Sequence, residues 1–483
     1  MNKLSKIVAS TKWDAVIPCI AFAVYFWISL HLYPRMAPDE YLRLTIPFFI
    51  SDNNALPLGP EPEIVNPIWG FSYAYTAYGP SMLSAVFVEI ASWFTTNASV
   101  LIVAARLTSV VSGALTVFLA MRIARRLFQN PASSILLGTL VAFTPQFAFM
   151  SSYHNNDIPS ACAVTILILA WLRGIQDGWD TKNAALLGLG LGACSVTYYF
   201  GYGFILASIP LFFVSIFHSR GKVKIDKRKI WGLVGVVFVV ALATGGWYFI
   251  RNGIIFDGDV IGMSTRDVLA EQMAQEEYKP SKHLTPQREG WSVWHMIFGD
   301  YNGFGWWEYT SQSLVGFFGY MEISLSSSMY LGYALLVPFL LIGIFSFRRV
   351  TMERGKLLLH SAMLFGLFMA VAFTVYYSWA SDYEPQGRYV YSAFVVLALY
   401  AVLGMETIGT LVASFVSRFV YMGQSAGHAK DIGRRRLVTH GASVELLVAA
   451  CLYILAFAYV WKNWLGQCLT GVVPPDSLVP FFQ

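Results

Sequence analysis

Long runs of apolar residues are the feature that most limits how this chain can fold. The first run, from about Trp13 to Tyr33, follows three lysines and is long enough to cross a bilayer as a helix, which takes about 20 residues. Only 13% of the 483 residues are charged, against about 25% in a typical soluble domain. The chain is therefore predicted to be a helical membrane protein. Because no small-residue cleavage site follows the first run, we interpret it as a retained helix and not as a signal peptide.

Further apolar runs predict about eleven membrane-spanning helices in one all-α integral membrane domain, residues 1–483. After the first, they lie at about 100–121, 133–151, 158–173, 183–199, 202–217, 231–250, 328–347, 357–379, 389–408 and 442–461. The run from 79 to 94 is short, and we assign it to an interfacial helix. A crossing there would turn three basic loops outward, against the positive-inside rule. These loops contain Arg122 to Arg126, Lys222 to Lys229 and Arg434 to Arg436.

This assignment fixes the predicted orientation of the chain. The N-terminus is cytoplasmic, and two long loops, at about 34–99 and 251–327, face outward. The net charge of +5 is spread over the loops between spans, which indicates orientation in a membrane and gives no sign of nucleic-acid binding. The five cysteines form neither a disulfide framework nor a zinc-site spacing.

The pair Asp39-Glu40 lies just beyond the first span, in the stretch from Pro34 to Leu42. Two adjacent carboxylates beside a membrane are costly unless water or a cationic group receives them, which indicates a polar site at the membrane surface. The alternative is a solvated loop, in which Pro38 sets a turn and Asp39 caps a short helix. The choice depends on whether other polar residues reach the same face.

A polar cluster, Tyr153-His154-Asn155-Asn156-Asp157, occupies the short loop after the third predicted span. Pro159 suits the first turn of the next helix, so Asp157 is either an N-cap or part of a site. His154 and Asp157 together are candidate cation ligands, although they are two where a metal site usually has three or four.

Two arginines lie at outward-facing helix ends, against the usual distribution of positive charge. We expect Arg251 to have a negatively charged partner, and a lipid headgroup is the simplest one. Arg388 follows Gly387, which we expect to permit a tight turn, and begins the tenth span at the depth of lipid phosphates. A guanidinium group matches phosphate oxygens with two parallel hydrogen bonds, which a lysine cannot do.

The second long loop is rich in aromatic residues, including Trp306 and Trp307. These residues either anchor the loop at the headgroup level or, within Gly303 to Trp307, form a stacking platform for a sugar ring.

Together these motifs resemble the GT-C superfamily of membrane glycosyltransferases. The similarity rests on Asp39-Glu40 after the first helix, Asn155-Asn156-Asp157 after the third, the Arg251-Asn252 helix exit, and Gln386-Gly387-Arg388-Tyr389 entering a late helix. Within the superfamily the chain is most similar to bacterial relatives of the protein O-mannosyltransferases and the lipid A aminoarabinose transferase. Relatives often carry a lysine after the fifth span, where this chain reads Thr197 to Gly203, so the resemblance does not supply donor headgroup contacts there.

The resemblance implies transfer of a sugar, with inversion, from a polyprenyl phosphate to a cell-envelope acceptor such as O-antigen or lipid A, at the periplasmic face of a bacterial inner membrane. It implies Asp39 as the base, with Glu40 raising the proton affinity of the pair or recruiting a cation. The donor phosphate would be bound by Arg388, Gln386, Tyr389 and, as a second cationic candidate, Arg251. The sugar and acceptor would be bound by Asn155, Asn156, Asp157, Trp306, Trp307 and Glu308. No cofactor is implied with certainty, and a divalent metal on His154 and Asp157 is left open.

Two functions from other classes are alternatives. A lipid-linked glycan flippase or transporter would show charged residues buried mid-span and paired halves, and neither is evident in the sequence. A non-catalytic subunit that binds polyprenyl lipid would bind, but not hydrolyse or transfer, a labelled polyprenyl-linked sugar.

Overall fold

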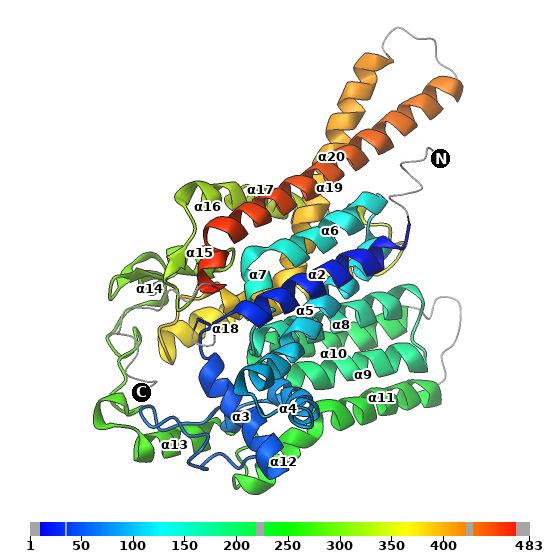
Figure 1. The fold of residues 1–483 in the computed structure, drawn as a ribbon. Helices are drawn as coiled ribbons and strands as arrows, with labels where there is room; N and C mark the ends of the chain where they lie inside the picture. Colours follow the sequence, from blue (N-terminus) through cyan, green and yellow to red (C-terminus); the bar gives the residue numbers. More distant parts are fainter. Residues whose placement is uncertain (1–9, 34–35, 219–226, 422–427, 470–483) are drawn as a thin grey trace.

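The protein is an all-helical bundle with two short β-hairpins (Figure 1). This computed structural model describes residues 10–33, 36–218, 227–421 and 428–469. Pro34, Arg35, the N-terminal lysines Lys3 and Lys6, and part of the basic cluster from Lys222 to Lys229 lie outside the described residues. Within the described part, nine helical stretches are long and apolar enough to cross a membrane. They are Trp13–His31, Ala98–Leu127, Asp157–Gln176, Tyr199–Ile216, Lys227–Ile255, Ser327–Phe345, Lys356–Ala380, Gly387–Val420 and Leu437–Asn463.

These nine stretches coincide with nine of the predicted spans, and the other two predicted spans form shorter helices. The run at 133–151 is split into α6 (Pro131–Phe143) and α7 (Pro145–Met150). The break occurs at Pro145, which has no N–H to donate and therefore disfavours a continuous helix. The run at 183–199 forms α9 (Thr181–Ser195). A 13-residue helix such as α6 is about 20 Å long, less than the roughly 30 Å hydrocarbon core.

Long helices that pack side by side form the bundle. They are α2 (Trp13–His31), α5 (Ala98–Leu127), α8 (Asp157–Gln176), α10 (Tyr202–His218), α11 (Lys227–Ala241), α18 (Lys356–Ala380), α19 (Phe394–Val420) and α20 (His428–Asn463). Single-turn elements interrupt or join them: η2 (Tyr199–Gly201), the π-helix η4 (Leu242–Gly246), η6 (Phe347–Arg349), η7 (Gly387–Ala393) and η8 (Leu465–Leu469). The pair α16 (Ser327–Ala334) and α17 (Leu336–Phe345) lies against α19 and has a largely exposed apolar surface.

The first long loop holds two helices, α3 (Glu40–Asn53) and α4 (Gly79–Ser92), with the short turn η1 (Tyr73–Tyr75) between them. One face of α4 packs against α3 and α5. Its other face exposes Leu83, Val86 and Ile90. An exposed apolar stripe beside a membrane bundle is what an interfacial helix requires, so α4 remains our prediction for that role.

The second long loop folds into small elements at the same end of the bundle. They are α12 (Trp247–Ile255), α13 (Met263–Met273), η5 (Glu276–Tyr278), α14 (Val293–Phe298), β1 (Asp300–Tyr301), β2 (Phe304–Gly305), α15 (Trp306–Ser313), β3 (Phe317–Phe318) and β4 (Ile323–Ser324). The hairpins are antiparallel, with Asp300 opposite Gly305 and Phe317 opposite Ser324. The backbone N–H of Gln275 donates to the carbonyl of Ile68 over 3.0 Å, which joins this loop to the first one.

Basic residues meet at the opposite end of the bundle, where α2 begins (Figure 1). Arg125 pairs with Asp14 at 2.5 Å, and Arg126 pairs with Asp177 at 2.9 Å. The ends of α2, α5 and α8 that carry these charges are therefore neighbours, as the charge pattern predicts. That this end faces the cytoplasm remains a prediction.

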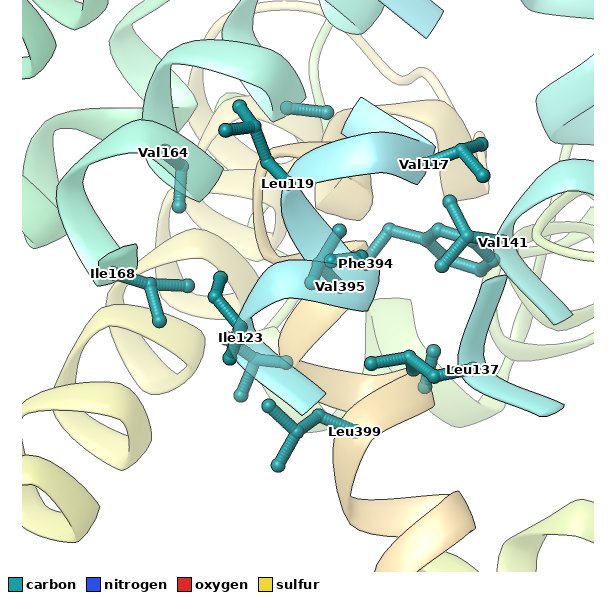
Figure 2. Packing of buried hydrophobic residues seen from close by; sticks show 14 of the residues in the cluster. Val117, Leu119, Ile123, Leu137, Val141, Val164, Ile168, Phe394, Val395 and Leu399 are labelled. Atoms are coloured by element: carbon teal, nitrogen blue, oxygen red, sulfur yellow. The ribbon is translucent and has the colours of Figure 1, made fainter. Parts of the chain in front are cut away.

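The core lies where α5, α6, α8 and α19 meet (Figure 2). Figure 2 shows aliphatic side chains of α5 packed between those of α8 and α19. Phe394, at the start of α19, stacks on Phe147 of α7 with ring centroids 5.4 Å apart. This packing fixes the start of α8 and the start of α19 relative to α2, and both starts carry residues that the sequence marks as functional.

Candidate active site

Asp39 and Arg388 are in direct contact, although 349 positions separate them in the chain. Arg388 Nη2 donates to Asp39 Oδ2 over 2.7 Å. Asp39 precedes α3 and has a positive φ of 61°, which an aspartate adopts less readily than a glycine and which is common at functional sites. The Arg388 side chain is 8% exposed and that of Asp39 is 30% exposed. The pair therefore lies at the edge of the bundle interior, at the end where the two long loops meet.

Arg388 is held in place by close contact between η7 and α15. The backbone N–H of Gly387 donates to Ser313 Oγ over 2.7 Å, and the Tyr391 hydroxyl donates to the Leu314 carbonyl over 2.8 Å. A Cβ atom on Gly387 would lie 2.5 Å from the carbonyl oxygen of Thr310 and would also clash with the Leu314 backbone. The φ of Gly387 is not positive. The glycine is thus required for close packing and not, as the sequence suggested, for a tight turn.

Glu40 faces away from Asp39 and is completely buried against Arg106 of α5. Arg106 Nε and Nη2 donate to its two carboxylate oxygens over 2.8 and 2.6 Å. The same oxygen Oε1 accepts the backbone N–H of His154 over 2.8 Å. Arg106 also donates to the carbonyls of Ser29 and Leu32. Glu40 therefore joins α3 to α2, to α5 and to the loop before α8.

This geometry corrects two expectations drawn from the sequence. Glu40 does not raise the proton affinity of Asp39, because Arg106 neutralises it. Burial raises the pKa of Asp39, but the charges of Arg388 and Arg43 and the hydrogen bond from Arg388 outweigh burial and lower that pKa below its ordinary value. Arg106 is also a charged residue buried within a span, a feature that the sequence seemed to lack.

Two residues at this site escaped the sequence analysis. Arg43 lies one turn after Asp39 on α3 and is 7% exposed. The spacing of four, which places two helix residues on one face, could have pointed to it. Arg106 had a plainer signal, since an arginine inside an apolar run of membrane length requires a buried partner.

The loop before α8 uses most of its polar groups to hold itself together. Asn155 donates to the carbonyls of Met150 and Tyr153 and accepts the N–H of Ile158. Asn156 donates to the Ala77 carbonyl over 3.2 Å. Asp157 differs, because it is 3% exposed and its Oδ1 has no hydrogen-bond partner among the described residues.

His154 is engaged on both ring nitrogens. Nε2 lies 3.0 Å from Ser81 Oγ, and Nδ1 lies 3.1 Å from Ser84 Oγ. Burial, with smaller contributions from the charges of Arg43 and Arg106, lowers the pKa of His154 to about 3. Across the residues that the structure describes, no group of three His, Cys, Asp or Glu side chains is placed to hold a metal ion. His154 is thus a neutral part of the loop's support, and the pair His154 and Asp157 does not form a cation site in this arrangement.

Part of the chain matches a known family, and the fold matches solved structures. Residues 85–247 match the family model described as dolichyl-phosphate-mannose-protein mannosyltransferase. ArnT from Cupriavidus metallidurans, solved with undecaprenyl phosphate bound, gives a TM-score of 0.51 at 14% identity over 96% of this chain and 78% of that one. Residues 85–247 are thus similar to this mannosyltransferase family, and the fold of the chain is that of ArnT. The apo oligosaccharyltransferase of Archaeoglobus fulgidus gives a TM-score of 0.52 at 14% identity over 91% of this chain and 56% of that one. No curated protein matches this chain in sequence.

Aromatic rings cluster around Tyr389, which adjoins Arg388. Tyr389 stacks on Phe200 with centroids 4.7 Å apart, and its hydroxyl lies 3.3 Å from Arg388 Nη2. Tyr377, near the end of α18, and Tyr198, just before η2, both pack edge-on against the Tyr389 ring. Tyr198 lies in the segment where relatives often carry a lysine. This segment therefore gives the site aromatic faces and hydroxyls in place of a charge.

Gln386 contacts Glu384 through its side-chain amide. Burial raises the pKa of Glu384 to about 8, against the opposing effect of Arg388. Gln386 therefore bonds a carboxyl group next to Arg388, and its amide is directed at the protein.

Arg251, Trp307 and Glu308 lie outside the cluster around Asp39 and Arg388. Arg251 donates to the carbonyls of Pro57 and Leu56 over 2.7 and 3.4 Å, so it holds the first long loop. Trp307 borders an apolar cavity of about 590 Å³ between α6, α15 to α17, α19 and α20. Glu308 is exposed and accepts from Gln312 over 2.9 Å. Trp306 is buried, and its Nε1 has no partner in the described chain.

Proposed function

We propose that this glycosyltransferase moves a sugar from a polyprenyl-phosphate donor to a hydroxyl group of a cell-envelope acceptor, with inversion at the anomeric carbon. The contact between Asp39 and Arg388 carries the proposal, because it puts a carboxylate and a guanidinium within reach of one substrate headgroup. The family match supports the class of donor. The first long loop supplies Asp39 and η7 supplies Arg388, on the face of the membrane that we infer to be periplasmic.

The proposed reaction is a single displacement. The acceptor oxygen bonds to the anomeric carbon as the bond from that carbon to the phosphate oxygen breaks, and the bonding pair leaves with the phosphate. Asp39 takes the proton of the acceptor hydroxyl. Arg388 binds the phosphate, whose charge grows from about −1 to −2 as it leaves. Donor binding would also draw Arg388 toward the phosphate and so free Asp39 to act as the base.

Other residues have supporting roles in this proposal. Asp157, buried with a free oxygen, accepts a hydrogen bond from a sugar hydroxyl. Asn155 and Asn156 shape the loop that presents it, and Tyr389 with Gln386 holds the surroundings of Arg388. Trp306, Trp307 and Glu308 place α15 over the acceptor. We assign Arg251 a smaller part than Arg388, because its Nη2 donates to the backbone carbonyls of Leu56 and Pro57.

Mass analysis of envelope glycans tests the function. A strain that lacks this chain should lose a residue of defined mass from O-antigen, lipid A or another glycan, and that mass identifies the sugar. The wild-type chain should restore it, and so should Asp52→Asn, an exposed carboxylate on the same helix α3. Asp39→Asn should not, because loss of a general base typically slows a reaction by about 100-fold or more. Envelope glycans that are identical with and without the chain would overturn the transferase function, and restoration by Asp39→Asn would remove Asp39 from the role.

A further inference from the structure

Arg43 is buried at the site without a partner of its own. Its side chain projects from α3 one turn beyond Asp39, and the residue is 7% exposed. The guanidinium carbon lies 4.1 Å from the centre of the Tyr73 ring and 6.0 Å from that of Tyr198. Within the described residues, no carboxylate or carbonyl accepts a hydrogen bond from it, which leaves its N–H groups available.

This arrangement is unusual for a buried arginine. An unpaired buried charge costs several kcal/mol, whereas a cation–π contact returns only about 0.5–2 kcal/mol. The other two buried arginines nearby are paired, Arg106 with Glu40 and Arg388 with Asp39. Arg106 and Arg388 each form an ion pair with a carboxylate, whereas Arg43 forms none among the described residues. We therefore expect the partner of Arg43 to be an anion from outside the chain.

Arg43 and Arg388 act on the same small region. The charges of both reach Asp39, Tyr73 and Tyr198, and both interact electrostatically with Asp157. Arg388 donates a hydrogen bond from Nη2 to Asp39, and its buried Nε has no hydrogen-bond partner among the described residues. Two guanidinium groups with unused N–H donors thus lie near Asp39, and among the described residues Asp39 is the one carboxylate that forms an ion pair with either.

We propose that Arg43 is a second binding residue for the phosphate of the lipid donor, with Tyr73 and Tyr198 packing against its guanidinium group. This inference rests on the proposed function and extends it. A guanidinium binds phosphate oxygens through two parallel bonds, so two arginines can hold one phosphate from two sides and stabilise the charge that it gains on leaving.

Binding of undecaprenyl phosphate to the full chain in phosphatidylcholine nanodiscs tests the inference, with uncharged undecaprenol as the comparison lipid. Arg43→Gln should weaken affinity for undecaprenyl phosphate by about tenfold or more, equivalent to about 1.4 kcal/mol, and leave affinity for undecaprenol unchanged. Arg43→Lys should lose less, because it keeps the charge without the fork. Arg251→Gln is the matched control, a partly buried arginine on backbone carbonyls at the same end of the bundle. It should lose less affinity for undecaprenyl phosphate than Arg43→Gln does and leave affinity for undecaprenol unchanged.

Each result is decisive. Equal losses for both lipids in Arg43→Gln would show a structural role and overturn the inference, as would unchanged affinity for undecaprenyl phosphate. If Arg43→Gln does not fold, Arg43→Lys decides by the same comparison, because undiminished binding of undecaprenyl phosphate contradicts the need for a fork. A wild-type protein that does not prefer undecaprenyl phosphate over undecaprenol would instead refute the donor class of the proposed function.

Discussion

Glu40 and Arg106 form a two-bonded ion pair that is shut off from solvent, with 0% and 2% of their side chains exposed. The adjacent Asp39 is 30% exposed and pairs with Arg388 instead. Two consecutive residues are thus a carboxylate built into the fold and a carboxylate that faces the site, and mutation should separate their effects.

Glu40→Gln is expected to act on stability. Removing one partner of a buried ion pair typically lowers the free energy of unfolding by about 3–5 kcal/mol, and here it leaves the Arg106 guanidinium charged and only partly bonded. Asp39→Asn should cost less, because the Asp39 side chain is 30% exposed and the asparagine oxygen can still accept a hydrogen bond from Arg388. Denaturant or thermal unfolding of both variants in the same detergent measures the difference. Equal stability of Glu40→Gln and the wild type would contradict this division of roles.

The pH dependence of transfer should report the lowered pKa of Asp39. As a base, Asp39 must be deprotonated, and kcat/KM follows the pKa of the free enzyme. Since Arg388 and Arg43 hold that pKa below its ordinary value of about 3.9, no acid limb from Asp39 should appear in kcat/KM above about pH 4. In Arg388→Gln the charge and its hydrogen bond are gone, so the acid limb of the residual activity should move to higher pH. If the acid limb of kcat/KM lies at the same pH in Arg388→Gln as in the wild type, Arg388 does not set the pKa of Asp39.

Gly387→Ala should impair transfer through the position of Arg388. The new methyl group would meet the backbone of Thr310 and Leu314, so η7 and α15 must separate, at a cost of about 1–3 kcal/mol for an overpacked contact. We expect turnover to fall by about tenfold, since small displacements in an active site slow reactions markedly. Gly235→Ala in α11 is the control, because a Cβ atom there meets nothing within 4 Å. Turnover and melting temperature of the two variants, measured together, distinguish misplacement from a general loss of stability.

Hydropathy and charge were sufficient to predict nine spans and the end of the bundle where polar residues meet. The contact between Asp39 and Arg388 follows from that topology, because both lie at helix ends on one side. The partner of Glu40 does not follow, since it depends on the rotation of α5 about its own axis, which an apolar run leaves open. The environment of Arg43 could not be predicted from the sequence either. The two rings against its guanidinium group come from η1 and from the segment before η2, which are far apart in the chain.

His154 should make stability fall in mild acid. Its folded-state pKa is about 3, below the roughly 6.5 of an unfolded histidine, so between these values the unfolded chain binds a proton that the folded chain does not. Stability must then rise with pH across this window, by up to about 1.4 kcal/mol per pH unit from this group alone. His154→Gln, which can still bond to Ser81 and Ser84 but does not titrate, should flatten the dependence of melting temperature on pH between about 6.5 and 4. His295 is exposed on α14, and His295→Gln should leave the slope as it is in the wild type. An unchanged slope in His154→Gln would mean that the imidazole is protonated in the folded protein, and the two serines would then have to accept, not donate, its hydrogen bonds.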